Sequence, residues 1–140
     1  MSKTRSTGLA LRTKSVGSPI DGRRDGLRIL VARYRGRGLP SSAYDVWMAN
    51  LGPSEKLLRG FLDGKVEWPE YTKRYQAELF QASPLDEANA TIKNHGQKFT
   101  LRLIKELARR QPVTLLCHCD EQELHCHRHL LKRLIESSRI

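Results

Sequence analysis

Two short aliphatic runs, at residues 27–32 and 113–118, limit the folds open to this chain more than any other feature. Both are rich in Leu, Ile and Val and are bounded by Gly or Pro, which is typical of strands buried inside a sheet. The second run follows residues 97–110, which have the apolar spacing of an amphipathic helix and end at Gln111 and Pro112. A helix that leads directly into a buried strand indicates a parallel sheet.

Further elements can be placed along the chain from spacing and breaker residues. Residues 9–16 alternate as a strand does, residues 43–51 suggest a short helix, and helices are expected from Ser54, from Trp68 and near Cys126. The apolar side chains expected on helix faces or in the core are Trp47, Leu57, Leu58, Phe61, Leu62, Trp68, Tyr71, Tyr75, Leu79, Phe99, Leu103, Ile104, Leu107, Ala108, Leu130, Leu131, Leu134 and Ile135. The predicted fold is α/β, a single small domain over residues 9–140 with a short, largely parallel sheet flanked by helices. Residues 1–8 are predicted to be a flexible basic tail.

Charge and hydropathy narrow the possible partners. The 140 residues carry a formal net charge of +10, which favours phosphorylated or polyanionic ligands and makes nucleic-acid binding through a basic surface one alternative. The apolar runs are far shorter than the roughly 18 residues of a membrane span, and the N-terminal segment lacks the apolar block of a secretory signal. No membrane association and a cytoplasmic location are therefore expected.

Three cysteines lie close together near the C-terminus. Cys117, Cys119 and Cys126 form an odd, crowded set, which favours thiol or metal chemistry over structural disulfides. Cys117 falls at the carboxyl end of the second predicted strand and Cys126 at the start of the last helix. Ligand sites in open α/β sheets lie at such strand ends, so this segment is the predicted functional site.

Thiol chemistry is one interpretation of the cluster, with Cys126, Cys117 and His127 as the candidate catalytic residues. A helix start stabilises a thiolate at Cys126, whereas the nearby acids at residues 120–123 oppose it if they point inward. The alternative without chemistry is that Cys117 and Cys126 are inert packing residues, which is common for free cysteines.

Zinc binding is the second interpretation. Cys117, Cys119, Cys126 and His127 supply four ligands of the kind that zinc prefers. Neighbouring histidines offer further choices, so the spacing alone does not single out a ligand set. On the alternative that involves no metal, these histidines are surface residues of a loop and a helix.

An anion site is the third expectation. Arg35 and Arg37 lie in a glycine-rich loop after the first aliphatic run, and Arg128 lies on the first turn of the last helix. If the two strands are neighbours, these arginines converge on a small anionic or phosphorylated ligand. A merely solvated basic turn explains Arg35 and Arg37 equally well.

An ordered series of short motifs resembles the YeaO-like domain-of-unknown-function 488 family over about residues 9–137. The matching segments are DGLRILV at 25–31, RGL at 37–39, DVW at 45–47, LGPS at 51–54, WPEY at 68–71, RYQAEL at 74–79 and PVTLL at 112–116. Cys117 followed by Cys126, His127 and Arg128 is similar to a Cys…Cys-His-Arg signature of another branch. The resemblance implies a small, largely parallel α/β fold but no established activity.

One departure from the family pattern concerns the loop after the first strand. Where the YeaO-like branch has Asp-Arg followed by Trp-Pro-Arg-Gly, this chain has Ala32, Arg33 and the sequence YRGRG at 34–38. The chain therefore lacks an acidic residue that the resemblance would otherwise offer for chemistry.

Overall fold

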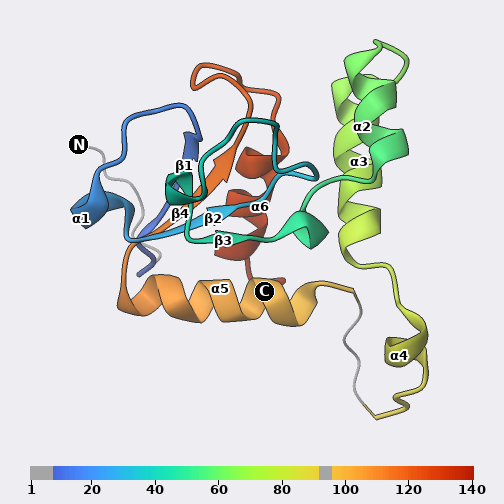
Figure 1. Ribbon diagram of the computed structural model, residues 1–140. Helices are drawn as coiled ribbons and strands as arrows, with labels where there is room; N and C mark the ends of the chain where they lie inside the picture. Colours follow the sequence, from blue (N-terminus) through green and yellow to red (C-terminus); the bar gives the residue numbers. More distant parts are fainter. Residues whose placement is uncertain (1–7, 92–95) are drawn as a thin grey trace.

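The sheet consists of four strands that all run parallel (Figure 1). The structure, a computed structural model, describes residues 8–91 and 96–140. The strands are β1 (Leu11–Ser15), β2 (Leu27–Leu30), β3 (Val46–Trp47) and β4 (Val113–Cys117), and they lie in the order β1-β4-β2-β3. Because β4 is paired on both sides, all its residues are buried. The predicted parallel sheet is confirmed, and of the tail expected at residues 1–8 only Gly8 falls within the described residues.

The long helices of the described residues follow the expected order, and two short helices, α1 (Gly22–Asp25) and α4 (Pro84–Glu87), were not expected. The long helices are α2 (Glu55–Leu62), α3 (Trp68–Leu79), α5 (Lys98–Arg110) and α6 (His127–Glu136), with 3-10 turns at Ser41–Ala43 and Ala49–Leu51. Glu78 of α3 accepts hydrogen bonds from the Ser54 backbone N–H at 2.8 Å and from its hydroxyl at 2.5 Å. Ser54 in turn caps α2 by accepting from the Leu57 N–H, so one contact both begins α2 and joins it to α3.

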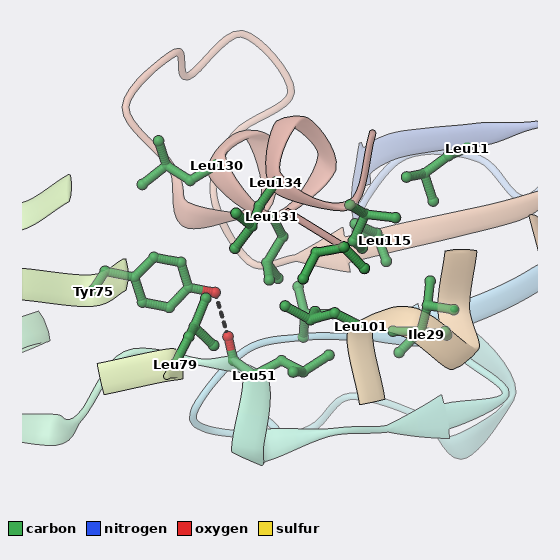
Figure 2. Packing of buried hydrophobic residues seen from close by; sticks show 14 of the residues in the cluster. Leu11, Ile29, Leu51, Tyr75, Leu79, Leu101, Leu115, Leu130, Leu131 and Leu134 are labelled. Carbon is green, nitrogen blue, oxygen red and sulfur yellow. Dashed lines mark hydrogen bonds between the residues drawn. The ribbon is translucent and has the colours of Figure 1, made fainter. Parts of the chain in front are cut away.

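The main core lies on the sheet face covered by α5 and α6. Alternate strand residues point to one face, so Ile29 and Leu115 meet Leu101 of α5 and Leu131 of α6 in a single cluster (Figure 2). The intervening strand residues Leu30 and Leu116 point to the other face and belong to a smaller cluster, which Cys117 and Cys126 join at the carboxyl end of β4. Both cysteines are thus buried packing residues at one end of the sheet.

Tyr75 links α3 to the rest of the core. Its ring is fully buried, and its hydroxyl donates to the carbonyl oxygen of Leu51 at 2.5 Å (Figure 2). Tyr71, Tyr75 and Leu79 are all buried, which confirms the predicted stripe of α3.

The substitution Tyr75→Phe is expected to lower the free energy of unfolding by about 1–2 kcal/mol, because it leaves a buried carbonyl oxygen without its donor and creates no large cavity. Urea denaturation of both proteins measures this loss. Tyr34→Phe is the control. The Tyr34 side chain is half-exposed, so removing its hydroxyl should change the free energy of unfolding little.

The helix predicted at residues 43–51 is wrong. This segment instead places β3 between two 3-10 turns, and the backbone N–H groups of Asp45 and Met48 donate to the carbonyl oxygens of Arg28 and Leu30 on β2. Pairing with the exposed edge of β2 outweighs the local helical pattern. Trp47 therefore lies on the edge strand and is 41% exposed. The prediction that Trp47 is a core residue is wrong.

The predicted apolar faces of two helices also need correction. Phe99 and Leu103 of α5 are mostly exposed, and the buried face of that helix comprises Leu101, Ile104 and Ala108. On α2 only Leu57 is buried, whereas Leu62 is 72% exposed. Spacing identified both helices, but packing against neighbouring elements decided which side of each is buried. The last helix matches its prediction, since Leu130, Leu131, Leu134 and Ile135 are all buried.

Candidate functional site

The predicted site lies at the carboxyl ends of β2 and β4. Because these strands pair directly, the loop after β2 lies beside the loop after β4, and the imidazole Nε2 of His118 is 3.0 Å from the carbonyl oxygen of Tyr34. Gly36 has a φ of 95°, and a Cβ there would lie 2.6 Å from the His118 ring. Glycine at this position therefore permits the close approach of the two loops.

A cluster of sulfur and nitrogen atoms occupies the space between β4 and α6. The Cys117 Sγ lies 3.9 Å from the Cys119 Sγ and 3.9 Å from the His127 Nδ1. One ligand atom from each of Cys117, Cys126 and His127 lies within 4.8 Å of the others, and all three residues are buried. Cys117, Cys119, Cys126 and His127 are called the thiol cluster below.

The ring of His127 is held in one tautomer by the end of β2. Its Nε2 lies 2.8 Å from the carbonyl oxygen of Val31, and a carbonyl can only accept, so Nε2 carries the proton. In the neutral ring the lone pair of Nδ1 then faces the Cys117 sulfur. This geometry suits both acceptance of the thiol proton and binding of a metal ion.

Arg128 is the largest fully buried side chain. Its guanidinium donates to the carbonyl oxygens of Cys119, Asp120 and Glu121 at 3.2–3.3 Å and lies 3.8 Å from the Cys126 Sγ. No ion pair in the described part of the chain includes Arg128, and its Nε has no hydrogen-bond partner there. The guanidinium therefore faces the thiol cluster on one side, and its charge also helps to lower the pKa of the Glu121 carboxyl.

The pKa values of the three thiols are driven apart. Hydrogen bonds donated by Cys119 and Cys126 lower the pKa of the Cys117 thiol, and the interaction with His127 lowers it further. The pKa of Cys119 is raised to about 11, first because its S–H donates to Cys117, and the pKa of Cys126 is raised for the same reason. The cluster therefore favours one thiolate, at Cys117, with two protonated neighbours as donors.

The acidic residues near the cluster point in different directions. The Glu121 carboxylate accepts from the Ser15 N–H and the Ser18 hydroxyl, which lowers the pKa of Glu121 and holds its charge at the end of β1. Asp120 and Glu123 instead line a cavity beside the cluster. The concern that all three acids oppose a thiolate is thus removed for Glu121.

This cavity has a volume of about 410 Å³ and opens beside the thiol cluster. Three groups of residues line it: the loops after β2 and β4, the start of α6, and the facing sides of α2 and α3. The lining residues are Ala32, Arg33, Tyr34, Pro53, Leu58, Phe61, Leu62, Tyr71, Cys117, His118, Cys119, Asp120, Glu123, His125, Cys126 and His127. A volume of this size suits a small-molecule ligand.

The three arginines predicted to bind an anion are outside the cavity lining. Arg128 lies beneath the loop and contacts carbonyl oxygens, the Arg35 Nε donates to the Tyr44 hydroxyl at 2.7 Å, and Arg37 is exposed. Among the described lysines and arginines, Arg33 lines the cavity. Its guanidinium donates to the carbonyl oxygens of Gly52 and Pro53. The role of Arg35, Arg37 and Arg128 in anion binding stays a prediction.

Sequence reasoning missed the wall that α2 and α3 contribute. The ring of His125 stacks on Trp68 of α3, with centroids 4.6 Å apart and planes at 13°. Phe61 and Tyr71 continue this aromatic surface. Helical spacing predicts Phe61, Trp68 and Tyr71 as core residues, and no local signal indicates that α2 and α3 face the end of the sheet.

The fold and site define a small parallel α/β protein with a cysteine/histidine cluster at the carboxyl end of its central strand. The chain belongs to the DUF488 family, because the model DUF488-N3a, described as "Active DUF488-N3 subclade", matches residues 11–139. It is also 31% identical over 108 residues to the uncharacterised protein YeaO of Escherichia coli (strain K12), covering 76% of this chain and 80% of YeaO. No solved structure matches the chain. The resemblance seen in the sequence motifs is confirmed.

The described helices are all too short or too polar to span a bilayer.

Proposed function

We propose that the chain binds a small molecule in the 410 Å³ cavity and carries out thiol-dependent chemistry there with Cys117 as the nucleophile. The observation that carries this proposal is the buried guanidinium of Arg128, which forms no direct ion pair with a described carboxylate and lies against the thiol cluster. The Glu121 carboxylate feels its charge, but that carboxylate is bonded to Ser15 and Ser18. A positive charge so close to buried thiols favours a thiolate, which is the reactive form of cysteine.

The neighbouring side chains fit distinct roles in this proposal. His127, with its proton on Nε2, presents Nδ1 to Cys117 and can take the thiol proton as the sulfur becomes a thiolate. Cys119 and Cys126 act as hydrogen-bond donors that stabilise the charge at Cys117. The sequence favoured Cys126 as the thiolate, whereas the hydrogen bonds favour Cys117.

The pH dependence of alkylation tests this proposal. A free thiol loses its reactivity as the pH falls through its pKa of about 8.5. Because the pKa of Cys117 is lowered, the rate at which iodoacetamide modifies Cys117 should stay high at that pH and fall only at lower pH. Mass spectrometry of tryptic peptides identifies the modified residue, and Cys117→Ser is the control. A midpoint at or above that of a free thiol, or modification confined to Cys119, would contradict the proposal.

Zinc binding is a second candidate function, favoured by the convergence of Cys117, Cys126 and His127 within 4.8 Å. These are ligand types that zinc prefers, and the Val31 carbonyl orients His127 as an outer partner of a metal ligand typically does. Cys119 lies near enough to Cys117 to supply a fourth ligand. With Cys119 bound the site would be closed and structural, whereas without it one position would face the cavity.

Metal analysis separates the two candidates. Protein purified without chelator should contain about one zinc per chain if the metal proposal holds, and Cys126→Ser should lose it. Cys119→Ser distinguishes a closed from an open site, since only a closed site loses affinity strongly. Metal-free, folded protein with a reactive Cys117 would leave thiol chemistry as the function.

Other expectations drawn from the sequence remain predictions. Binding of nucleic acid rests on the net charge of +10 and is tested by the salt dependence of affinity. A cytoplasmic location agrees with three unpaired cysteines, because reducing compartments preserve free thiols.

A further inference from the structure

The wall of the cavity that faces the thiol cluster is apolar and aromatic. Leu58, Phe61 and Leu62 of α2 and Tyr71 of α3 contribute this surface, together with Pro53. Burial and the neighbouring thiols raise the pKa of Tyr71 far above its ordinary value, so its phenol is uncharged. A ligand that fills the cavity therefore needs an apolar body.

The charged groups that line the cavity favour a cation. Asp120 and Glu123 are two acidic residues of the lining, and among the described lining residues Arg33 is the one Lys or Arg. The guanidinium of Arg33 is directed to the carbonyl oxygens of Gly52 and Pro53. The Asp120 carboxylate has no hydrogen bond or ion pair with any described residue, which leaves it available to a ligand.

The thiol cluster does not reverse the preference of the cavity for a cation. The guanidinium of Arg128 lies 3.8 Å from the Cys126 Sγ, behind the loop and outside the cavity lining, and offsets negative charge in the cluster. The high overall positive charge acts mainly from more distant surface residues, and salt screens such charges over about 8–10 Å. The groups in direct contact therefore decide which ligand is bound.

The aromatic rings add to the same preference. Phe61 and Tyr71 lie with their ring centroids 4.6 Å apart, and both line the cavity, as does His125 in its stack on Trp68. The faces of aromatic rings attract organic cations. Carboxylates and aromatic rings in one small cavity form the usual surroundings of an organic ammonium group.

From this arrangement we propose that the ligand of the cavity is an organic ammonium ion with an apolar body, bound between the carboxylates of Asp120 and Glu123 and the aromatic wall of α2 and α3. This inference rests on the proposed function in taking the cavity as the ligand site. It replaces the anionic ligand expected from the sequence with one of opposite charge.

Binding of matched probes tests the proposal. Phenethylammonium, phenethyl alcohol and phenethyl phosphate share one apolar body and differ in charge, and each is titrated into the full chain while NMR resonances are recorded. We expect phenethylammonium to shift the ring signals of Phe61, Tyr71 and His125, with an affinity at least about tenfold above that of the phosphate, corresponding to one favourable charge contact.

Charge-neutralising variants locate the effect. The double variant Asp120→Asn/Glu123→Gln should reduce the affinity for phenethylammonium about tenfold and leave that for phenethyl alcohol unchanged. Gln at position 123 can still accept the His125 N–H that Glu123 accepts at 3.0 Å. The control variant Glu87→Gln/Glu106→Gln removes two carboxylates from α4 and α5, outside the cavity, and should change neither affinity.

The outcomes distinguish this inference from the proposed function. Tighter binding of the phosphate, equal binding of all three probes, or no shift at the cavity residues would overturn the inference even if Cys117 reacts as expected. Conversely, selective binding of phenethylammonium with an unreactive Cys117 would uphold the ligand class and reject thiol chemistry.

Discussion

Replacing Arg128 with methionine is expected to lower the free energy of unfolding by about 3–5 kcal/mol, the range for removing one partner from a buried charge arrangement. The guanidinium contacts three carbonyl oxygens of the loop at residues 119–121 and the Cys126 sulfur. Methionine fills much of the volume but donates no hydrogen bond, so those carbonyl oxygens lose a donor. Urea or guanidinium denaturation measures the change.

The same substitution also tests the electrostatic role of Arg128. If its charge is balanced by a thiolate, Arg128→Met should move the pH midpoint of Cys117 alkylation upward. Arg133→Met is the matched control, because Arg133 lies on the exposed side of the same helix and should affect neither stability nor alkylation much. A stable Arg128→Met protein with an unchanged midpoint would show that the cluster holds no thiolate near this residue.

The substitution Gly26→Ala is expected to destabilise the fold by about 3 kcal/mol, because it combines a strained backbone with an overpacked site. Gly26 joins α1 to β2 with a φ of 60°, and a Cβ there would lie 2.0 Å from the carbonyl oxygen of Pro112. That carbonyl accepts the Leu27 N–H at the start of the β2–β4 pairing. Relief of the clash would therefore separate the two central strands.

A second glycine isolates the two contributions. Gly64 also has a positive φ, 77°, but a Cβ there would meet no atom within 4 Å. Gly64→Ala should therefore show the backbone cost alone, about 1 kcal/mol. Equal losses in the two variants, measured by chemical denaturation, would show that the contact with Pro112 adds nothing.

Local sequence patterns correctly predicted three of the four strands, β1, β2 and β4, and the longer helices. The aliphatic runs became β2 and β4, since continuous Leu, Ile and Val is stable only where both faces of a strand are covered. The order of helix and strand predicted their parallel direction. The motifs that resemble DUF488 proteins gave the family, because their order and spacing over the chain are specific even though each piece is short.

Patterns failed where partners distant in sequence compete with local preference. Residues 43–51 were expected to be helical, but the edge of β2 offers hydrogen bonds that this segment completes as β3. On α5, Phe99 and Leu103 share helical spacing with Ile104, yet the sheet contacts the side that carries Leu101. A period of three and four residues identifies a helix, but the packing of its neighbours decides which side is buried.

The sequence by itself placed Cys117, Cys119, Cys126 and His127 at one strand end and one helix start, and so predicted that they lie close together. Only the tertiary structure decided what surrounds them. It buried Arg128 against main-chain carbonyl oxygens and brought α2 and α3 over the cavity, leaving Asp120 in its lining. Spacing along a chain places side chains on elements, whereas burial, charge balance and cavity shape arise from contacts between elements, and these exist only once the chain has folded.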